Sequence, residues 1–465
     1  MKRIAIVGGG IAGTAAAYEL ATLARSGVPV EAVVFESSHR LGGIVETVRE
    51  GGFIIECGPD AWVTEKPWAR QLAIELGLED ELIPSNDADR KTYVLIDGRL
   101  QPMPDGMRMM VPADLEALDS SSLFSADAKQ AFHNEIARAE ELKSIAPHHD
   151  ESVADFVHRH FGDEVLQKIG APLLSGVFGG DVTRLSVNAV MAPFVAMEHE
   201  HGSLITALQQ RSATNGVSSS IFTSLRSGMG TLIDRMVAAI PREWIRLGDT
   251  VQYISRETDG WLVGTAKEVE RFDALFMAAP VDVARSLLEP LDSRAAELME
   301  MDASSAVVVG FGFDNVGDFT IPQGFGFLVP PGPGSLLLAC TFVDQKFNDR
   351  IPENGRLVRA FFGGAAAERL MRCRNDETAA VARLELARIL GPLPEPQVTV
   401  VRRWPRSLPQ YGVGHLERMQ ELAEHVTDLE GLWLLGNGYR GVGLPDLIRD
   451  ARAAAQAAIN HPNPS

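Results

Sequence analysis

The start of the chain combines two apolar runs with one helical pattern. Residues 4–7 form an apolar run that enters a glycine turn at 8–10. Residues 14–24 have helical spacing, and a second apolar run over 33–35 ends on Glu36. Short continuous apolar runs are typical of strands that are buried on both faces. The pattern therefore predicts a βαβ unit with parallel strands.

A long block in the middle of the chain is helical in its pattern. From about residue 127 to 210 the apolar positions recur with helical spacing, and the pattern breaks at Pro147, Gly162, Gly179–Gly180 and Gly202. This block predicts a helical insertion that is separate from the βαβ unit.

Two local signals precede this block. An amphipathic stretch that begins at Lys66–Pro67 predicts a helix that stops at Gly77. Residues 93–100 carry Asp97–Gly98 between apolar positions. That pair predicts a β-hairpin with a tight turn.

Strand patterns return in the second half of the chain. The predicted strands cover 261–263, 274–279, 305–313, 324–329, 335–343, 357–362, 398–403 and 432–435. Helices are predicted after Pro280, over 376–390 and from Pro445 to about Ile459. The last strand and helix resemble the unit that opens the chain.

Composition narrows the function classes. The chain has 465 residues, 45% of them hydrophobic, and a net charge of −19, which argues against a general nucleic-acid binder. Its three cysteines form no C-x-x-C pair, so neither a disulfide framework nor a metal site is expected. The apolar run after Met1–Arg3 is too short for a signal peptide, and no apolar stretch is long enough to span a membrane. We expect a cytoplasmic protein.

The first glycine turn has the spacing of a dinucleotide-binding motif. Gly8 permits the tight turn, Gly10 lets backbone N–H groups approach a pyrophosphate, and Gly13 lets the helix pack on the strand. The helix N-terminus favours the phosphate charge. Glu36 is placed to accept hydrogen bonds from a ribose. The turn therefore predicts a bound dinucleotide.

A second glycine run closes the chain. The strand over 432–435 opens into a loop over 436–444, and Pro445 and Asp446 begin the final helix. Pro at a helix start and an acid in its first turn are typical of a helix N-terminus. Aimed at a flavin, such an N-terminus stabilises the negative charge of the reduced ring. A connection that needs its glycines only for packing is the alternative.

Two resemblances follow from these motifs. Arg40–Gly43 and Phe53–Pro59 resemble the extension shared by FAD enzymes of the amine-oxidase and phytoene-desaturase superfamily. Over nearly its full length the chain resembles the oxygen-dependent protoporphyrinogen/coproporphyrinogen oxidase family. The segments that carry this second resemblance are 36–43, 56–59, 174–181 with Leu185–Ser186, 324–330, 409–411 with Gly414–His415, and 441–446.

The family resemblance implies a function. It implies noncovalent FAD and the six-electron oxidation of protoporphyrinogen IX to protoporphyrin IX with O2 as acceptor, and coproporphyrinogen III is the alternative substrate. The flavin N5 carries the hydride transfer, so no catalytic side chain and no metal are expected. We also expect that the product is handed over to a chelatase and that the protein is a monomer or homodimer. Peripheral membrane contact through residues 107–199 is a further expectation.

The resemblance also assigns binding residues. The cofactor contacts that it implies are Gly8, Gly9, Gly10, Ile11, Ala12, Gly13, Glu36, Ser37, Arg40, Gly43, Ile44, Gly58, Pro59, Asp60, Ala61, Val251, Val442, Gly443 and Leu444. Val251 lies outside any sharp motif.

Five residues are implied for the substrate. Phe325, Gly326 and Leu328 resemble a clamp on the macrocycle, Gly176 the point of close approach beneath it, and Arg90 an arginine that pairs with a propionate. Ordinary strand core remains an alternative for the two apolar side chains, and a solvated charge is the alternative for the arginine. The basic residues available for a substrate with four carboxylates are Lys66, Arg70, Arg90, Lys91, Arg108 and Arg184.

These observations predict an α/β protein combined with an α+β part. A discontinuous Rossmann-type FAD-binding domain is expected over 1–85, 225–295 and 405–465. A mixed-sheet substrate domain is expected over 86–106, 200–224 and 296–404, with the helical insertion over 107–199. A flavin amine oxidase, a carotenoid desaturase and a nonenzymatic flavin-fold protein are the more distant alternatives.

Overall fold

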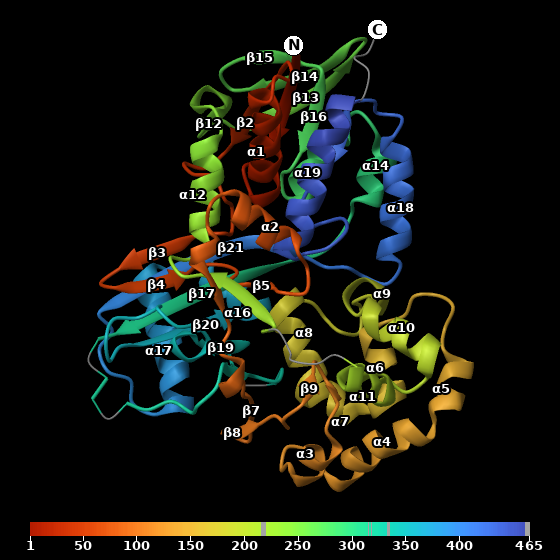
Figure 1. Ribbon diagram of the computed structural model, residues 1–465, viewed down its shortest axis with the longest axis vertical. Helices are drawn as coiled ribbons and strands as arrows, with labels where there is room; N and C mark the ends of the chain where they lie inside the picture. Colours follow the sequence, from red (N-terminus) through yellow and green to blue (C-terminus); the bar gives the residue numbers. More distant parts are fainter. Residues whose placement is uncertain (215–219, 315, 318, 333–334, 461–465) are drawn as a thin grey trace.

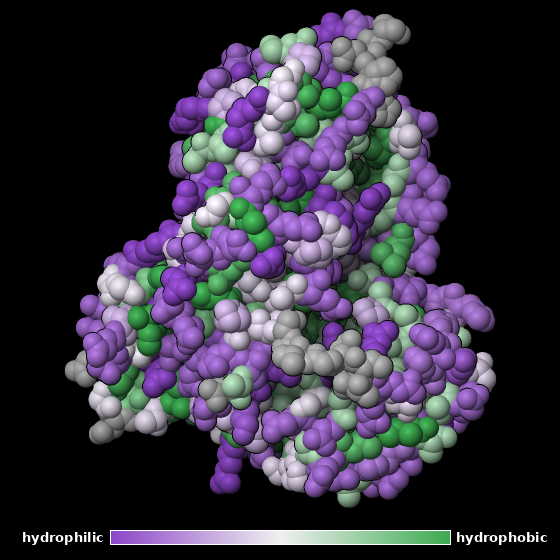
Figure 2. Space-filling model, viewed as in Figure 1, coloured by the Kyte–Doolittle hydropathy of each residue, from purple (hydrophilic) through white to green (hydrophobic). Residues whose placement is uncertain are grey.

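The computed structural model describes residues 1–214, 220–314, 316–317, 319–332 and 335–460. Three parts are visible in Figure 1: an upper part around a parallel sheet, a second sheet at lower left and a lobe of helices at lower right. Hydrophilic side chains predominate on the face that Figure 2 shows, with hydrophobic ones scattered among them.

A five-stranded parallel sheet forms the centre of the upper part. Its strands in spatial order are β12 (Ile245–Leu247), β2 (Val30–Glu36), β1 (Lys2–Val7), β16 (Ala274–Met277) and β22 (Leu432–Leu434). The predicted βαβ unit is confirmed, and distant segments of the chain complete its sheet.

Both faces of this sheet are covered, because alternate residues of a strand point to opposite faces. Ile4 and Ile6 pack on the helical face, whereas Ala5 and Val7 pack on the other face. The helical face is covered by α1 (Ile11–Arg25), α2 (Trp68–Glu75), α12 (Gly230–Ala239) and α19 (Leu444–Asn460). The other face is covered by β13 (Val251–Glu257), β14 (Gly260–Thr265), β15 (Val269–Phe272), α13 (Val281–Leu288), α14 (Ser293–Leu298) and α18 (His415–Val426).

A seven-stranded mixed sheet forms the second part. Its order is β21 (Val398–Pro409), β17 (Ala303–Phe313), β20 (Arg356–Phe362), β19 (Ala339–Phe342), β18 (Gly326–Leu328), β7 (Thr92–Ile96) and β8 (Arg99–Pro102). The short helix α15 (Val343–Lys346) follows β19, while α16 (Gly364–Leu370) and α17 (Asn375–Leu390) pack on the sheet. The β7–β8 hairpin turns through Asp97 and Gly98, both at positive φ, as the sequence predicts.

Short strands outside the two large sheets form small sheets of their own. The hairpin of β3 (Thr47–Glu50) and β4 (Phe53–Glu56) packs its apolar side chains against the seven-stranded sheet. A small sheet contains β5 (Trp62–Val63), β11 (Phe222–Leu225) and β6 (Leu82–Pro84). The strands β9 (Met107–Arg108) and β10 (Val111–Pro112) form a further pair.

The helical lobe has a hydrophobic core of its own. Its helices are α3 (Leu115–Ser120), α4 (Ala126–Ala137), α5 (Ala139–Ile145), α6 (Val153–Phe161), α7 (Asp163–Val165), α8 (Ala171–Phe178), α9 (Val187–Val190), α10 (Ala192–His201) and α11 (Leu204–Thr214). The helices α6, α8 and α10 end at Gly162, Gly179 and Gly202, all at positive φ, which confirms these predicted breaks.

The described residues of the 200–224 segment, 200–214 and 220–224, lie elsewhere than expected. The helix α11 packs within the helical lobe through Leu204, Ile205 and Leu208, and β11 pairs with β5 and β6. Neither element joins the seven-stranded sheet. The cause is the apolar side of α11, which is buried by the other helices of the lobe.

The methionine-rich stretch before α3 is part of the core of the lobe. Met110 is fully buried, and Met103, Met107 and Met109 pack partly against the same cluster. None of the helices within the described ranges combines the length and the apolar character that crossing a bilayer requires.

Candidate functional site

The turn between β1 and α1 is shaped by close backbone packing. Gly8 has φ +106°, and a Cβ there would lie 2.5 Å from the carbonyl oxygen of Ala278. A Cβ on Gly13 would lie 1.9 Å from the carbonyl oxygen of Gly8. Gly10 is the N-cap of α1, and a Cβ there would meet no atom within 4 Å. Two glycines are therefore needed for packing, whereas Gly10 faces open space in front of a helix N-terminus, as a pyrophosphate requires.

The acid at the end of β2 is tied to this turn. One carboxylate oxygen of Glu36 accepts a hydrogen bond of 2.7 Å from the backbone N–H of Gly9. The other accepts a hydrogen bond of 2.7 Å from the N–H of Ser38, and the hydroxyl of Ser37 lies 3.5 Å from the same oxygen. These bonds fix the Glu36 carboxylate at the carboxyl end of the parallel strands, where ligands bind in such sheets.

The second glycine pair lies directly against the first. The N–H of Gly42 donates to the carbonyl of Gly9 at 2.7 Å, and Gly10 and Gly42 form a parallel bridge. A Cβ on Gly43 would lie 3.1 Å from the Cα of Gly10. The structure thus brings the two sequence motifs into one surface.

Arg40 holds the loop that carries this second glycine pair. Its guanidinium donates to the carbonyls of Leu41 and Val45, both at 3.2 Å, and to the carbonyl of Gly43. It also forms an ion pair of 3.2 Å with Glu46. These contacts make Arg40 a clamp on the loop, and its direct contact with a cofactor stays a prediction.

The loop over residues 57–61 lies beside the same surface. A Cβ on Gly58 would lie 2.0 Å from the carbonyl oxygen of Ile44, so these two predicted cofactor residues touch. The N–H of Cys57 donates to the carbonyl of Glu46 at 2.8 Å. The indole N–H of Trp404 donates to the carbonyl of Cys57 at 2.7 Å. The seven-stranded sheet therefore helps to position this loop.

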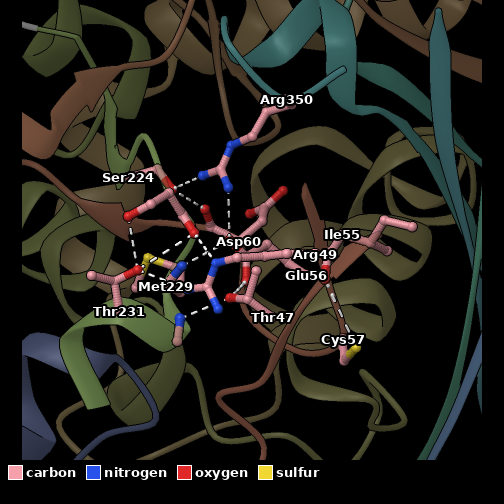
Figure 3. A network of polar contacts seen from close by, with 12 residues as sticks. Thr47, Arg49, Ile55, Glu56, Cys57, Asp60, Ser224, Met229, Thr231 and Arg350 are labelled. Carbon is pink, nitrogen blue, oxygen red and sulfur yellow. Dashed lines mark hydrogen bonds and ion pairs between the residues drawn. The ribbon is translucent and has the colours of Figure 1, made fainter. Parts of the chain in front are cut away.

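A buried network supports the strand that leads into this loop (Figure 3). The carboxylate of Glu56 accepts hydrogen bonds from the Thr47 hydroxyl at 2.6 Å and from the Met229 N–H at 2.8 Å. It forms an ion pair of 3.0 Å with Arg350, which also donates to the Ser224 hydroxyl at 2.6 Å. Burial raises the pKa of Glu56 although Arg350 opposes that shift.

Sequence reasoning missed this network. Glu56 belongs to a quoted motif, but Arg350 follows it by 294 positions and Met229 by 173. The one available signal was the acid itself, at the end of a strand with apolar neighbours. A carboxylate in that position needs a buried partner.

The C-terminal glycine loop lies at the start of α19, which packs on α1. Asp446 is buried in the first turn of α19 and forms ion pairs with Lys66 and Arg449. A Cβ on Gly443 would lie 3.2 Å from the carboxylate of Asp446. Val442, Gly443 and Leu444 therefore lie at a second helix N-terminus, and their contact with a cofactor stays a prediction.

Val251 lies at the edge of this region. It begins β13 and is buried in the apolar cluster on the face of the parallel sheet that includes Val7 and Phe35. The N–H of Asp249 donates to the carbonyl of Glu36 at 3.0 Å. The structure thus places Val251 two residues from a Glu36 contact, and its role as a cofactor contact stays a prediction.

Several of the residues expected to hold the substrate lie on or beside β18 and β7, next to the edge strand β8 of the seven-stranded sheet. β18 pairs with β7, so Gly326 lies opposite Thr92, and the N–H of Phe325 donates to the carbonyl of Lys91 at 2.8 Å. Arg90 lies beside this pairing and lines a small hollow. The other residues that line it are Thr92, Met103, Pro104, Asp105, Gly106 and Met107.

The remaining substrate candidates lie in β18, directly before it, or in the helix α8 that contacts it. Phe325 and Leu328 are buried, so an ordinary core role remains open for both. Gly326 has φ +141°, and a Cβ there would lie 1.9 Å from the carbonyl oxygen of Cys340. Gly176 lies in α8, which contacts β18, and a Cβ at Gly176 would meet no atom within 4 Å. Gly176 and Gly10 thus both face open space.

Most of the other basic candidates have a carboxylate partner. Lys66 pairs with Asp446, Arg70 lies 3.9 Å from Glu79, Arg108 lies 3.5 Å from Glu65, and Arg184 lies 2.8 Å from Asp302. Each is at least partly exposed in the structure. The pairs of Arg70, Arg108 and Arg184 have exposed partners and are weak, whereas Asp446, the partner of Lys66, is buried.

Comparisons with known proteins agree with this geometry. The chain is 31% identical to coproporphyrinogen III oxidase from Bacillus subtilis, with 99% of this chain and 98% of the relative covered. It is 28% identical to the chloroplastic protoporphyrinogen oxidase of Nicotiana tabacum, with 97% and 84% covered. A solved structure of a candidate protoporphyrinogen oxidase from an Exiguobacterium species has a TM-score of 0.86 at 32% identity, with 99% of each chain covered.

More distant likeness shows the fold alone. Cyclohexylamine oxidase from Brevibacterium oxydans has a TM-score of 0.71 at 17% identity, with 99% of each chain covered.

The family model for flavin-containing amine oxidoreductases matches residues 11–459. The predicted enzyme class and the FAD cofactor are confirmed. The chain is an FAD-dependent oxidoreductase and belongs to the family of flavin-containing amine oxidoreductases.

Proposed function

We propose that this protein oxidises coproporphyrinogen III to coproporphyrin III, with FAD as cofactor and O2 as electron acceptor. The sequence analysis favoured protoporphyrinogen IX and kept coproporphyrinogen III as the alternative. The names of the bacterial relatives support that alternative, because they match over nearly the whole chain and act, by name, on coproporphyrinogen III. The family resemblance of the motifs supports a porphyrinogen in either case.

One structural observation carries the substrate proposal. The β7–β18 pairing places Arg90 and Lys91 beside Phe325 and Gly326. A porphyrinogen has an apolar ring and anionic propionates, so its site needs an apolar wall next to basic side chains. An arginine binds a carboxylate well because its planar fork reaches both oxygens. We assign Arg90 to a propionate, and Phe325 and Leu328 to the apolar wall.

The chain's own contribution is binding and positioning. When bound, FAD supplies the acceptance of electrons from the macrocycle and their transfer to O2. The Gly8–Gly13 turn and the fixed carboxylate of Glu36 hold the dinucleotide. The open spaces at Gly10 and Gly176 permit close approach of a ligand to the backbone.

Porphyrin fluorescence tests this proposal. Purified protein loaded with FAD is mixed with coproporphyrinogen III in air-saturated buffer. We expect the growth of coproporphyrin fluorescence in step with oxygen uptake, well above the rate of oxidation without protein. A Gly10→Val protein is the control because it keeps the substrate residues. No porphyrin formation, together with turnover of an amine or a polyene, contradicts the proposal.

A further inference from the structure

Basic side chains outnumber carboxylates around the 57–61 loop. This is unexpected in a chain whose net charge is −19. The carboxylates there are Glu46, Glu56 and Asp60, and the basic residues are Arg40, Arg402, Lys346, Arg350 and Arg359. The loop therefore lies in a local surplus of positive charge.

One ion pair of this cluster includes a residue of the loop itself, Asp60, and joins it to Lys346. Both carboxylate oxygens of Asp60 lie 3.0 Å from the ammonium nitrogen of Lys346. The side chain of Lys346 is only 12% exposed and that of Asp60 only 15%. The ammonium of Lys346 also lies 4.8 Å from the centre of the Phe222 ring. The low exposure means that water screens this pair weakly.

A second cation lies directly behind the pair. The guanidinium of Arg359 lies 3.3 Å from the Asp60 carboxylate and donates to the carbonyl of Gly58. Its side chain is 2% exposed. Burial raises the pKa of Asp60, but Lys346 and Arg359 outweigh burial and hold that pKa below its usual range. Asp60 is therefore charged at neutral pH and balances one of the two cations.

The remaining buried charges do not remove this surplus. Arg350 is matched by Glu56 in the network of Figure 3. That leaves one net positive charge on Lys346, Arg359 and Asp60, beside Gly58. Both cations share the single carboxylate of Asp60, so the positive charge that remains favours an anion placed beside this loop.

We propose that Lys346 and Arg359, held in place by Asp60, stabilise the negative charge that the flavin gains on reduction. Uptake of two electrons and one proton leaves a flavin with one negative charge. A fixed positive charge near the ring favours that state over the oxidised ring, which is neutral. The inference rests on the FAD site of the proposed function and on the predicted contact of the 57–61 loop with the cofactor. It does not depend on which porphyrinogen is oxidised.

The midpoint potential of the bound flavin tests this inference with two substitutions of opposite sign. FAD-loaded protein is titrated with dithionite against a reference dye, in the absence of substrate. Lys346→Met removes a positive charge, and we expect the ratio of reduced to oxidised flavin to fall about tenfold, or about 30 mV for a two-electron couple. Asp60→Asn removes a negative charge at almost the same shape, and we expect the ratio to rise.

Matched controls separate local charge from general damage. Lys346→Arg keeps the charge and retains the potential of the parent protein. Lys143→Met removes the same charge from the exposed side of α5 and leaves the potential unchanged. If Lys346→Met does not fold or does not retain FAD, Asp60→Asn carries the test alone. Unchanged potentials, or shifts of the same sign in Lys346→Met and Asp60→Asn, overturn the inference.

Failure of the proposed function has a different signature. A parent protein that oxidises no porphyrinogen contradicts the proposed function. The opposite shifts of potential are measured without substrate and still hold in that case if the inference is right.

Discussion

The backbone N–H of Gly9 donates a hydrogen bond of 2.7 Å to the carboxylate of Glu36. This contact joins the glycine turn after β1 to the acid at the end of β2. Because Glu36 also accepts from the N–H of Ser38, its carboxylate is oriented by the backbone on both sides. An acceptor that is fixed in this way meets a ribose hydroxyl without a further loss of side-chain entropy.

Replacing Glu36 by Ala weakens FAD binding. The variant loses the ribose acceptor and leaves the Gly9 N–H without its partner. Hydrogen bonds to charged groups contribute about 1.5–3 kcal/mol, so we expect the Kd for FAD to rise by about tenfold to a hundredfold. Flavin fluorescence on titration of the apoprotein measures this change. Glu31→Ala removes an acid from the same strand, where it pairs with Arg3, and a similar loss of affinity in that control would argue against a specific role for Glu36.

Gly10 and Gly13 respond differently to a side chain. Gly10→Val folds with stability near that of the parent protein, because a Cβ there meets no atom within 4 Å, but it does not retain FAD. Gly13→Ala places a Cβ 1.9 Å from the Gly8 carbonyl oxygen, and overpacking of this kind costs about 1–3 kcal/mol. Thermal unfolding and the flavin absorbance of the purified variants distinguish the two effects. An FAD-loaded Gly10→Val protein contradicts the assignment of this turn.

A buried histidine connects three helices of the helical lobe. The two ring nitrogens of His160 each lie 3.1 Å from a carboxylate oxygen, one of Glu135 and one of Glu198. Glu198 also pairs with Arg159. Two acceptors that face one imidazole require both nitrogens to donate, so the ring is charged. Burial lowers the pKa of His160, but the bonds to the two glutamates outweigh burial and raise it.

This histidine makes the stability of the lobe depend on pH. Because the pKa of His160 is raised in the folded state, its contribution is fully present below the ordinary value of 6.5 and is lost as the pH rises through the folded-state pKa. His160→Leu removes one partner of a buried pair and costs about 3 kcal/mol at pH 6. Thermal unfolding of both proteins between pH 6 and pH 10 measures this contribution. A difference in melting temperature that does not shrink at alkaline pH contradicts the charged state.

Arg90 is the side chain assigned to a propionate. Arg90→Ala loses a charge-assisted hydrogen bond, which contributes about 1.5–3 kcal/mol, so we expect KM for coproporphyrinogen III to rise by about tenfold or more. Steady-state kinetics with porphyrin fluorescence measures KM and kcat separately. Arg294→Ala is the control, because Arg294 is exposed, pairs with Glu421 and is not among the substrate candidates. An unchanged KM in Arg90→Ala removes Arg90 from the substrate site.

Local signals in the sequence predicted much of the fold. The Gly8–Gly13 turn, the Asp97–Gly98 hairpin and the final helix depend on neighbouring residues, and all three occur where expected. Helix ends at Gly162 and Gly202 follow for the same reason, since each glycine adopts a positive φ that other residues avoid.

The parts that sequence reasoning missed depend on distant partners. Glu56 and Arg350 are separated by 294 positions, and Asp60 and Lys346 by 286. Nothing local indicates that two such side chains meet inside the protein. The expected boundary at residue 199 separates α11 from the helical lobe that buries it, because an apolar face does not state which core will bury it.

The preference between two porphyrinogens tests the central claim most directly. FAD-loaded protein is assayed with coproporphyrinogen III and with protoporphyrinogen IX under the same conditions, and kcat/KM is taken from porphyrin fluorescence. Coproporphyrinogen III has two more carboxylates that basic side chains can bind. We therefore predict a kcat/KM that is at least about tenfold higher for it, the equivalent of one charge-assisted hydrogen bond. An equal or higher kcat/KM for protoporphyrinogen IX would contradict the account.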